Sequence, residues 1–274
     1  MTLLDRRPLR RLVGAVGVAL SVILSMSQAG LPIEPNPPDL TGTWATILFY
    51  PEIAAIPFVG EITITALVGV LTHAVQTGSS VILYDTYCRT EVLSDSKIVS
   101  SEVPDRVMAS LAPPPRTAEI HRSSREWSFV QDWHLEVRGA VLDHPEHDPL
   151  PISPHDSRVI DMDDDGHPGF TVPVSALGIV SGDTYVVQRL RYRLFGDLLG
   201  PDRIEGLIEW TSEQNVIDGT DAFLMTPFVQ WHDPDPSHHR FVMQRLPDGA
   251  TCEDVEVVFE TFLPSEDVQT SPGG

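Results

Sequence analysis

One segment of the chain has residue types and spacing that suit metal binding. Asp161, Asp163 and Asp165 occupy alternate positions, and Gly166 follows them. Alternate spacing turns the three carboxylates to one side of a tight loop, because the glycine lets the backbone reverse direction. Hard cations prefer carboxylate and carbonyl oxygens, so we expect Asp161, Asp163 and Asp165 to bind Ca²⁺, with the shell completed by the backbone carbonyl of His167, by water or by a distant acid. The alternative is an acidic surface turn without a metal.

The aspartate pattern resembles two known kinds of calcium loop. It matches the first half of an EF-hand loop, but Val172 stands where the bidentate glutamate belongs, and the flanking residues are strand-like rather than helical. It also resembles the loops of integrin-type β-propeller repeats, although it occurs once and Gly169 replaces the last aspartate. The resemblance therefore implies a calcium ion that braces a loop or a contact surface, rather than a calcium sensor or a catalytic centre.

Histidines in two proline-rich loops suggest a second kind of metal site. Zinc hydrolases bind their metal through histidine and carboxylate ligands, so convergence of these loops would create a metal-dependent hydrolase. Neither loop has the H-E-x-x-H spacing of a helical zinc site, and the chain lacks a G-x-S-x-G nucleophile motif. Solvated loop histidines are the simpler interpretation, so the sequence identifies no catalytic residue and favours a protein that is not an enzyme. The loop histidines are His144, His147, His155, His232, His238 and His239.

The N-terminal residues have the features of an export signal. Arg6 and Arg7 belong to a basic start, an apolar run covers residues 12–26, and residues 27–29 suit cleavage by a signal peptidase. The apolar run is shorter than the roughly 20 residues that span a bilayer, which disfavours the alternative of an uncleaved anchor. We therefore expect residues 1–29 to be a signal peptide and the mature protein to be periplasmic or extracellular.

Cys88 and Cys252 are the two cysteines of the chain. In an oxidising compartment an isolated pair is most simply a disulfide, and free thiols are the alternative. The bond would close a long loop and remove unfolded-state entropy equivalent to at most about 5 kcal/mol. We expect this disulfide to tie the first third of the folded domain to its last strands.

Acidic residues dominate the mature chain. Without the four arginines and one aspartate of residues 1–29, it retains 14 basic and 38 acidic side chains, a net charge of −24. Such a surface repels nucleic acid and anionic lipid headgroups. Only 7% of residues are aromatic, which disfavours an outer-membrane barrel with its aromatic girdles. We expect a small apolar ligand or an envelope or surface partner, no nucleic acid, and no stable membrane insertion of the mature chain.

Period-two alternation of apolar and polar residues predicts a fold built almost entirely from strands. One short helix is expected at 107–111, and residues 196–202 indicate a connection within a hairpin. The regular spacing favours an all-β fold, either an antiparallel β-barrel or a barrel-like sandwich. We expect one domain, residues 39–263, between an extended leader at 30–38 and a disordered tail at 264–274. The alternating runs are 62–66, 133–138, 185–192, 204–210, 241–245 and 254–262.

The start of this domain resembles the opening of lipocalins and related calycin barrels. Gly42-Thr43-Trp44 matches their G-x-W motif. The resemblance implies an eight-stranded calycin-like barrel in which Trp44 closes one end and an arginine from a late strand, Arg240 or Arg245, packs over it. It also implies a non-enzymatic binding protein that holds a small apolar or amphiphilic ligand in the barrel, lined by residues 62–71 and neighbouring strands. The alternative is a structural or adhesive surface protein with a calcium-ordered loop.

Overall fold

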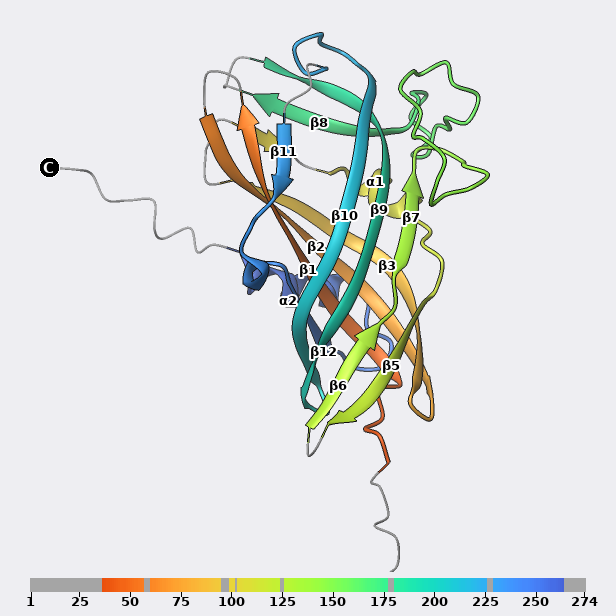
Figure 1. Ribbon diagram of the computed structural model, residues 1–274, viewed down its shortest axis with the longest axis vertical. Helices are drawn as coiled ribbons and strands as arrows, with labels where there is room; N and C mark the ends of the chain where they lie inside the picture. The colour runs from red at the N-terminus through yellow and green to blue at the C-terminus, as the bar shows by residue number, and fades with distance from the viewer. Residues whose placement is uncertain are drawn as a thin grey trace, which may run out of the picture. The chain divides into compact units, whose positions relative to one another are not determined.

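Antiparallel strands make up most of the structure that the computed structural model describes (Figure 1). The described residues are 36–56, 60–94, 99–101, 103–123, 126–176, 180–225 and 229–263. The predicted signal peptide at 1–29 and the predicted tail at 264–274 lie outside these residues. None of the described helices is long and apolar enough to cross a membrane.

Eight strands close into a ring, which confirms the expected all-β, barrel-like fold. Each ring strand pairs antiparallel with the next one along the chain, and the last pairs with the first. The first and last strands therefore satisfy each other's backbone hydrogen-bonding groups instead of exposing two sheet edges. The ring strands are β1 (Gly42–Ile56), β2 (Gly60–Thr77), β3 (Ser80–Ser94), β5 (Arg116–Ser123), β6 (Glu126–Gln131), β9 (Val180–Gly200), β10 (Arg203–Gly219) and β12 (Arg240–Arg245).

Shorter elements flank the ring. The five alternating runs between 62 and 245 overlap β2, β7, β9, β10 and β12, and the helix expected at 107–111 overlaps α1. β7 and β8 pair with the long strand β9, β4 pairs with β8, and β11 pairs with the end of β1. These elements are β4 (Val99–Ser101), α1 (Asp105–Ser110), β7 (His134–Arg138), β8 (Phe170–Ala176), β11 (Val229–His232), the 3-10 turn η1 (Pro236–His238) and α2 (Cys252–Glu260).

Alternate residues of the ring strands point inward and form the main apolar core. On β1 these include Trp44, Leu48 and Tyr50, all of them buried. Phe129 from β6 and Phe241 from β12 pack against each other in the same core, with ring centroids 6.2 Å apart. The interior is therefore occupied by large side chains contributed by strands on opposite sides of the ring.

Arg245 covers Trp44, as the G-x-W resemblance implies for one of the two candidate arginines. The guanidinium carbon of Arg245 lies 4.3 Å from the centroid of the Trp44 ring, and the Trp44 indole N–H donates to the Leu40 carbonyl at 2.9 Å. The other candidate, Arg240, lies over Phe49 instead, at 4.3 Å from its ring centroid. Adjacent ring strands thus join the first and last parts of the ring through side chains as well as through the backbone.

The C-terminal segment is a helix, so the strand predicted at 254–262 is wrong. Val255-Glu256-Val257 alternates like a strand, but apolar residues over the whole segment recur at 255, 258, 259 and 262, which is the spacing of one helix face. A capping box between Thr251 and Asp254 begins the helix. The buried side chains Val255 and Phe259 cover the outer face of β1 and β2, where they meet Ala45, Ile47, Phe49 and Leu67.

A disulfide and a glycine hold α2 against this outer face. Cys252, the first residue of α2, is bonded to Cys88 on β3, as expected from the sequence. Because the C-terminal segment is helical, the bond ties β3 to a helix rather than to a strand. A Cβ atom on Gly69 of β2 would lie 2.8 Å from the Phe259 ring, so a larger residue there would push the helix away.

Replacement of Arg245 by alanine is expected to lower the free energy of unfolding by about 2–3 kcal/mol. Besides its contact with Trp44, the guanidinium donates to the backbone carbonyls of Thr41 (2.8 Å) and Asp39 (2.7 Å), which would lose these partners. Urea unfolding measures the change. Arg122→Ala is the control, because Arg122 is exposed and lies 5.8 Å from its aromatic partner. Equal losses in the two variants would contradict the role given to Arg245.

Candidate functional site

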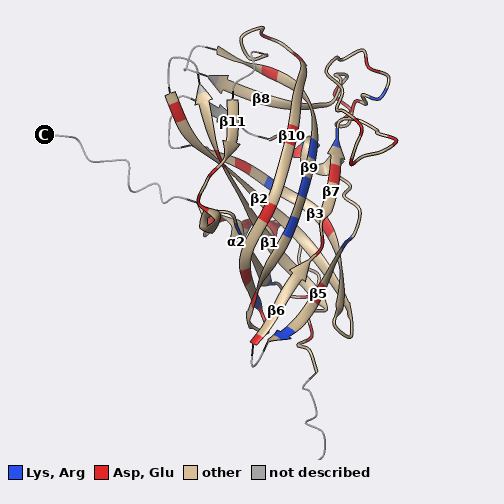
Figure 2. Cartoon of the chain, viewed as in Figure 1, with Lys and Arg blue, Asp and Glu red and all other residues tan. Residues whose placement is uncertain are grey.

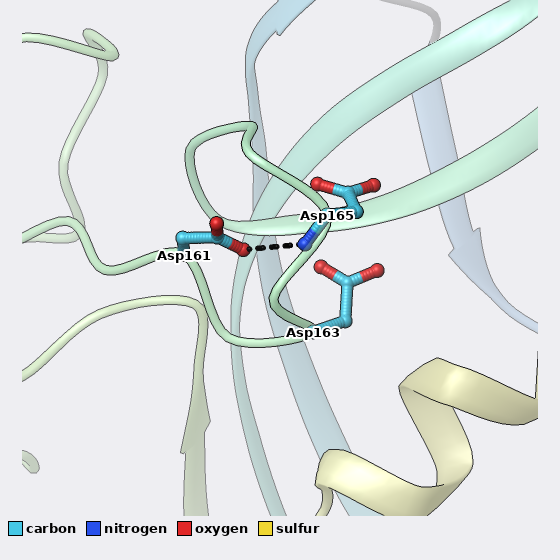
Figure 3. Close-up of side chains that lie close together, drawn as sticks. All are labelled: Asp161, Asp163 and Asp165. Carbon is cyan, nitrogen blue, oxygen red and sulfur yellow. Dashed lines mark hydrogen bonds between the residues drawn. The ribbon is translucent and has the colours of Figure 1, made fainter.

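The three aspartates of the predicted calcium loop lie together (Figure 3). One oxygen from each of Asp161, Asp163 and Asp165 lies within 4.8 Å of the others, and among the described residues no other group of three or more potential metal ligands is so close. Asp164 and Gly166 reverse the loop with left-handed φ angles of 53° and 89°. Asp161 accepts hydrogen bonds from the backbone N–H groups of Asp165 (3.2 Å) and Gly166 (2.9 Å), which order the turn.

A guanidinium group neutralises part of this cluster. Arg106 of α1 donates through Nε to Asp163 Oδ2 and through an Nη atom to Asp165 Oδ2, both at 3.1 Å. Thr171 Oγ1 also donates to Asp165 Oδ2, at 2.6 Å. The other oxygen of Asp163, Oδ1, is buried and has no hydrogen-bond partner among the described residues. Burial of a carboxylate oxygen without a partner costs free energy, so this atom is suited to bind a cation.

Histidine side chains do not join this cluster or build a zinc-like site. The imidazole of His167 stacks on Tyr185 with ring centroids 4.3 Å apart, so only the backbone carbonyl of His167 is left for the predicted ligand role. The histidine loops contribute no group of three converging ligand atoms within the part of the chain that the structure describes. The geometry therefore lends no support to the metal-dependent hydrolase.

A chain of buried polar side chains runs through the ring interior. Arg116 of β5 donates to both carboxylate oxygens of Asp85 on β3 and to Gln131 on β6. Asp85 accepts a further bond from Thr72 of β2 at 2.8 Å, and the Thr72 hydroxyl bonds the Thr46 hydroxyl of β1 at the same distance. These side chains are almost completely buried, so the ion pair and its hydrogen bonds are needed to offset the desolvation of two charges.

A second buried ion pair belongs to β7. Glu136 accepts from Arg138 at 2.6 Å and from the Tyr87 hydroxyl at 2.7 Å. Burial by itself would raise the pKa of Glu136, but the charge of Arg138 and these hydrogen bonds lower it to about 2. His134 Nε2 lies 3.3 Å from Glu136 Oε1 without hydrogen-bond alignment, and the Tyr50 hydroxyl also has no partner among the described residues. Buried charges and unsatisfied polar atoms in one interior are more typical of functional sites than of an apolar core.

Glu52 is a partly buried acid on the same face of β1 as Trp44 and Tyr50. It makes no hydrogen bond or ion pair with the described residues, and it lies opposite His232 in the pairing of β1 with β11. Burial raises the pKa of Glu52 to about 7. The pKa of Glu52 is thus raised whereas that of Glu136 is lowered, because Glu52 lacks a cationic partner.

Strand pairing around the ring is interrupted where β10 faces β11, and we call this interruption the seam. β12 covers β10 only from Arg203 to Leu207, whereas β11 pairs with β1 (Figure 1). Trp210 of β10 fills the seam. Its ring stacks on His232 with centroids 4.0 Å apart and meets Tyr50 edge-on at 5.0 Å. Trp210 therefore lies between the buried interior of the ring and its outer surface.

A pocket of about 380 Å³ lies at the seam. Most of its wall is apolar and a few polar groups converge on it, which is the usual composition of a site for a small organic molecule. We call it the seam pocket. Its apolar wall consists of Trp133, Phe195, Leu207, Ile208, Trp210, Pro234 and Pro236, and its polar groups are Glu209, His232, Asp233 and His239.

Hydrogen bonds to both ring nitrogens fix the tautomer of His239. The Trp210 indole can only donate, and it bonds His239 Nδ1 at 2.8 Å, so Nδ1 carries no proton. Nε2 therefore carries the proton and donates to the Asp233 carbonyl at 2.7 Å. Burial lowers the pKa of His232.

Sequence reasoning missed the seam pocket and both buried ion pairs. His134, Glu136 and Arg138 alternate with apolar residues, and such polar positions are normally those of a solvent-facing strand face. The burial of His134 and Glu136 shows that this face is turned inward. One sequence feature could have indicated the buried ion pair: polar residues, among them an acid and an arginine, occupy every second position of this strand. That pattern does not distinguish the two cases, because it is equally common on exposed strands.

The fold and these sites define the class of protein. It is an antiparallel ring of eight strands with a disulfide-bonded helix on its outer face and a ligand-sized pocket at a break in the ring. No family model matches the chain, and no curated protein or solved structure matches it.

Glu52→Gln is expected to stabilise the protein in a pH-dependent way. The pKa of Glu52 rises from an ordinary 4.5 to about 7 on folding, so the folded state binds this proton more tightly than the unfolded chain does. The resulting stabilisation is present below pH 4.5 and is lost as the pH rises through 7. The uncharged variant should gain at most about 3 kcal/mol over wild type at pH 8 and close to none at pH 4.

Urea unfolding at the two pH values measures this difference. Glu61→Gln is the matched control, because Glu61 is exposed on the neighbouring strand β2. A gain of equal size at both pH values, or a gain shared by the control, would contradict the burial of an ionisable Glu52.

Proposed function

We propose that this chain is an exported, non-enzymatic binding protein that holds a small apolar or amphiphilic ligand in the seam pocket. The observation that carries the proposal is the pocket itself, with its aromatic wall and few polar groups. The disulfide between Cys88 and Cys252 supports an oxidising compartment, and hence export. We place the ligand site at the seam rather than beside residues 62–71. Val68 and Val70 of that segment belong to the packed interior.

The ring further supports a calycin-like architecture. Its eight strands follow one another in chain order, Trp44 lies at the start of the first, and Arg245 from the last covers it. α2 packs on the outside of the ring, so the C-terminal segment leaves the interior to side chains of the strands. This architecture supplies a rigid frame in which a pocket at the edge of two strands keeps its shape with and without ligand.

An uncharged hydrophobic fluorophore such as N-phenyl-1-naphthylamine is expected to bind the protein at one saturable site. Leu207→Trp should weaken this binding at least about tenfold, because the larger side chain fills part of a small pocket. Fluorescence titration measures the dissociation constants. Ile82→Trp is the matched control, since Ile82 is exposed on β3 and does not line the pocket.

Two outcomes would overturn the proposal. One is the absence of saturable binding by wild type in the micromolar to millimolar range. The other is an equal effect of the two tryptophan substitutions, because the fluorophore would then bind elsewhere. Circular dichroism spectra of both variants establish that each retains the β-fold before binding is compared.

We propose in addition that the aspartate loop binds Ca²⁺, which would stabilise the protein rather than take part in chemistry. Support comes from the convergence of Asp161, Asp163 and Asp165 and from the buried oxygen of Asp163 that has no partner among the described residues. Arg106 already supplies one positive charge, so the ion would share the cluster with the guanidinium and use oxygens that Arg106 leaves free. Mixed sets of carboxylate, carbonyl and water oxygens are typical of calcium sites.

Calcium at millimolar concentration is therefore expected to raise the melting temperature of wild type by several degrees relative to chelator. Asp163→Asn should abolish the shift, because it removes charge from the buried ligand. Asp143→Asn, at an exposed position in the preceding loop, should keep it. Calorimetry that detects no calcium binding, together with an unchanged melting temperature, would show that the loop is an acidic turn stabilised by Arg106 alone.

A further inference from the structure

The charged groups that line the seam pocket are all acidic. Glu209 and Asp233 contribute carboxylates, and neither lysine nor arginine lines the wall. Burial lowers the pKa of His232, which disfavours its cationic form, and His239 uses both ring nitrogens in hydrogen bonds. An anionic headgroup in this pocket would be repelled by the carboxylates of its wall.

Neighbouring cations compensate these carboxylates only in part. Arg193 of β9 donates to Glu209 Oε2 at 2.7 Å, and Glu209 Oε1 has no hydrogen-bond partner in the described ranges. His238 bonds Asp233 Oδ2 at 2.8 Å, and that bond raises the pKa of His238. Arg193 and His238 each bond one oxygen of their carboxylate partner, so Glu209 Oε1 stays open to a cationic group of a ligand.

The aromatic wall also suits a cation. Trp133 already carries two guanidinium groups, with Arg191 at 4.4 Å and Arg193 at 5.0 Å from its ring centroid, so the protein's own cations use that ring. Phe195 and Trp210 supply the other aromatic surface of the pocket. Ring faces attract cations through their quadrupole, and this attraction grows where water is partly excluded. Carboxylates beside aromatic faces therefore favour an ammonium group over an alcohol of equal size.

We propose that the ligand of the seam pocket is a cationic amphiphile, an aliphatic or aromatic body that bears a protonated amine or a quaternary ammonium group. This inference rests on the proposed function and specifies its ligand. The apolar body lies against Leu207, Phe195 and the prolines, and the ammonium group lies between the aromatic faces and Glu209 and Asp233. The acidic surface of the whole chain raises the local concentration of such cations and repels fatty-acid anions.

Three eight-carbon probes at pH 7.5, each used below its micellar concentration, test the inference. Calorimetry compares octyltrimethylammonium, 1-octanol and octanoate on the full-length protein. Octyltrimethylammonium is expected to bind about tenfold more tightly than octanol, with octanoate the weakest. Its advantage should shrink between 50 and 500 mM NaCl because salt screens the carboxylates.

Two variants locate the charge effect. Glu209→Gln should weaken octyltrimethylammonium binding about three- to tenfold and leave octanol binding unchanged. The matched control is Glu213→Gln, because Glu213 lies on the same strand, pairs with Arg189 of β9 and does not line the pocket. Both side chains are largely exposed, so neither change threatens the fold.

The outcomes separate the two proposals. Octanol or octanoate binding as tightly as the ammonium probe would overturn the cationic ligand and leave the binding function standing. Equal effects of Glu209→Gln and Glu213→Gln would also overturn it, because the charge would then act from outside the pocket. Failure of all three probes and of the uncharged fluorophore to bind would overturn the proposed function itself.

Discussion

The pairing of β12 with β1 is the contact on which the rest of the structure depends. It joins Trp44 to Arg245, residues close to the two ends of the described chain, and it converts a meander of strands into a closed ring. Closing so long a loop costs chain entropy, which the backbone pairing, the cover of Arg245 over Trp44 and the disulfide between Cys88 and Cys252 together offset. Closure also places the segment after β12 on the outside of β1, where α2 packs.

The same pairing creates the seam, because β12 is too short to complete it. β12 has six residues, whereas its neighbours β1 and β10 have 15 and 17. β11 takes over the pairing with β1. Within the part of the chain that the structure describes, β10 has no partner strand on that side beyond Ile208, and the side chains of Trp210 and His239 fill the gap. A pocket with aromatic walls follows directly from this mismatch in strand length. The pocket to which we assign the proposed function thus lies where strand pairing around the ring is interrupted.

Charge is distributed differently inside and outside the ring. On the outer face arginines of β9 pair with glutamates of β10, as Arg193 does with Glu209, and such exposed pairs contribute little to stability (Figure 2). The interior holds the pairs Arg116–Asp85 and Arg138–Glu136, whose desolvation makes each partner necessary to the other. An interior of this kind specifies one arrangement of strands, since any shift in register would leave a charge buried alone.

Local patterns in the sequence determined much of this protein. Period-two alternation identified most of the strands, and the alternate aspartates from Asp161 to Asp165 predicted a converging cluster, because both depend on residues near in the chain. The arginine cover of Trp44 joins distant residues and was predicted from the resemblance of the G-x-W motif. The cysteine pair was predictable from its isolation. The tertiary structure alone decided that residues 252–260 form a helix, that Glu136 faces inward, and that Trp210 borders a pocket. Polar residues that alternate along a strand have the same pattern whether they face water or a buried partner, and only contacts between distant strands distinguish the two.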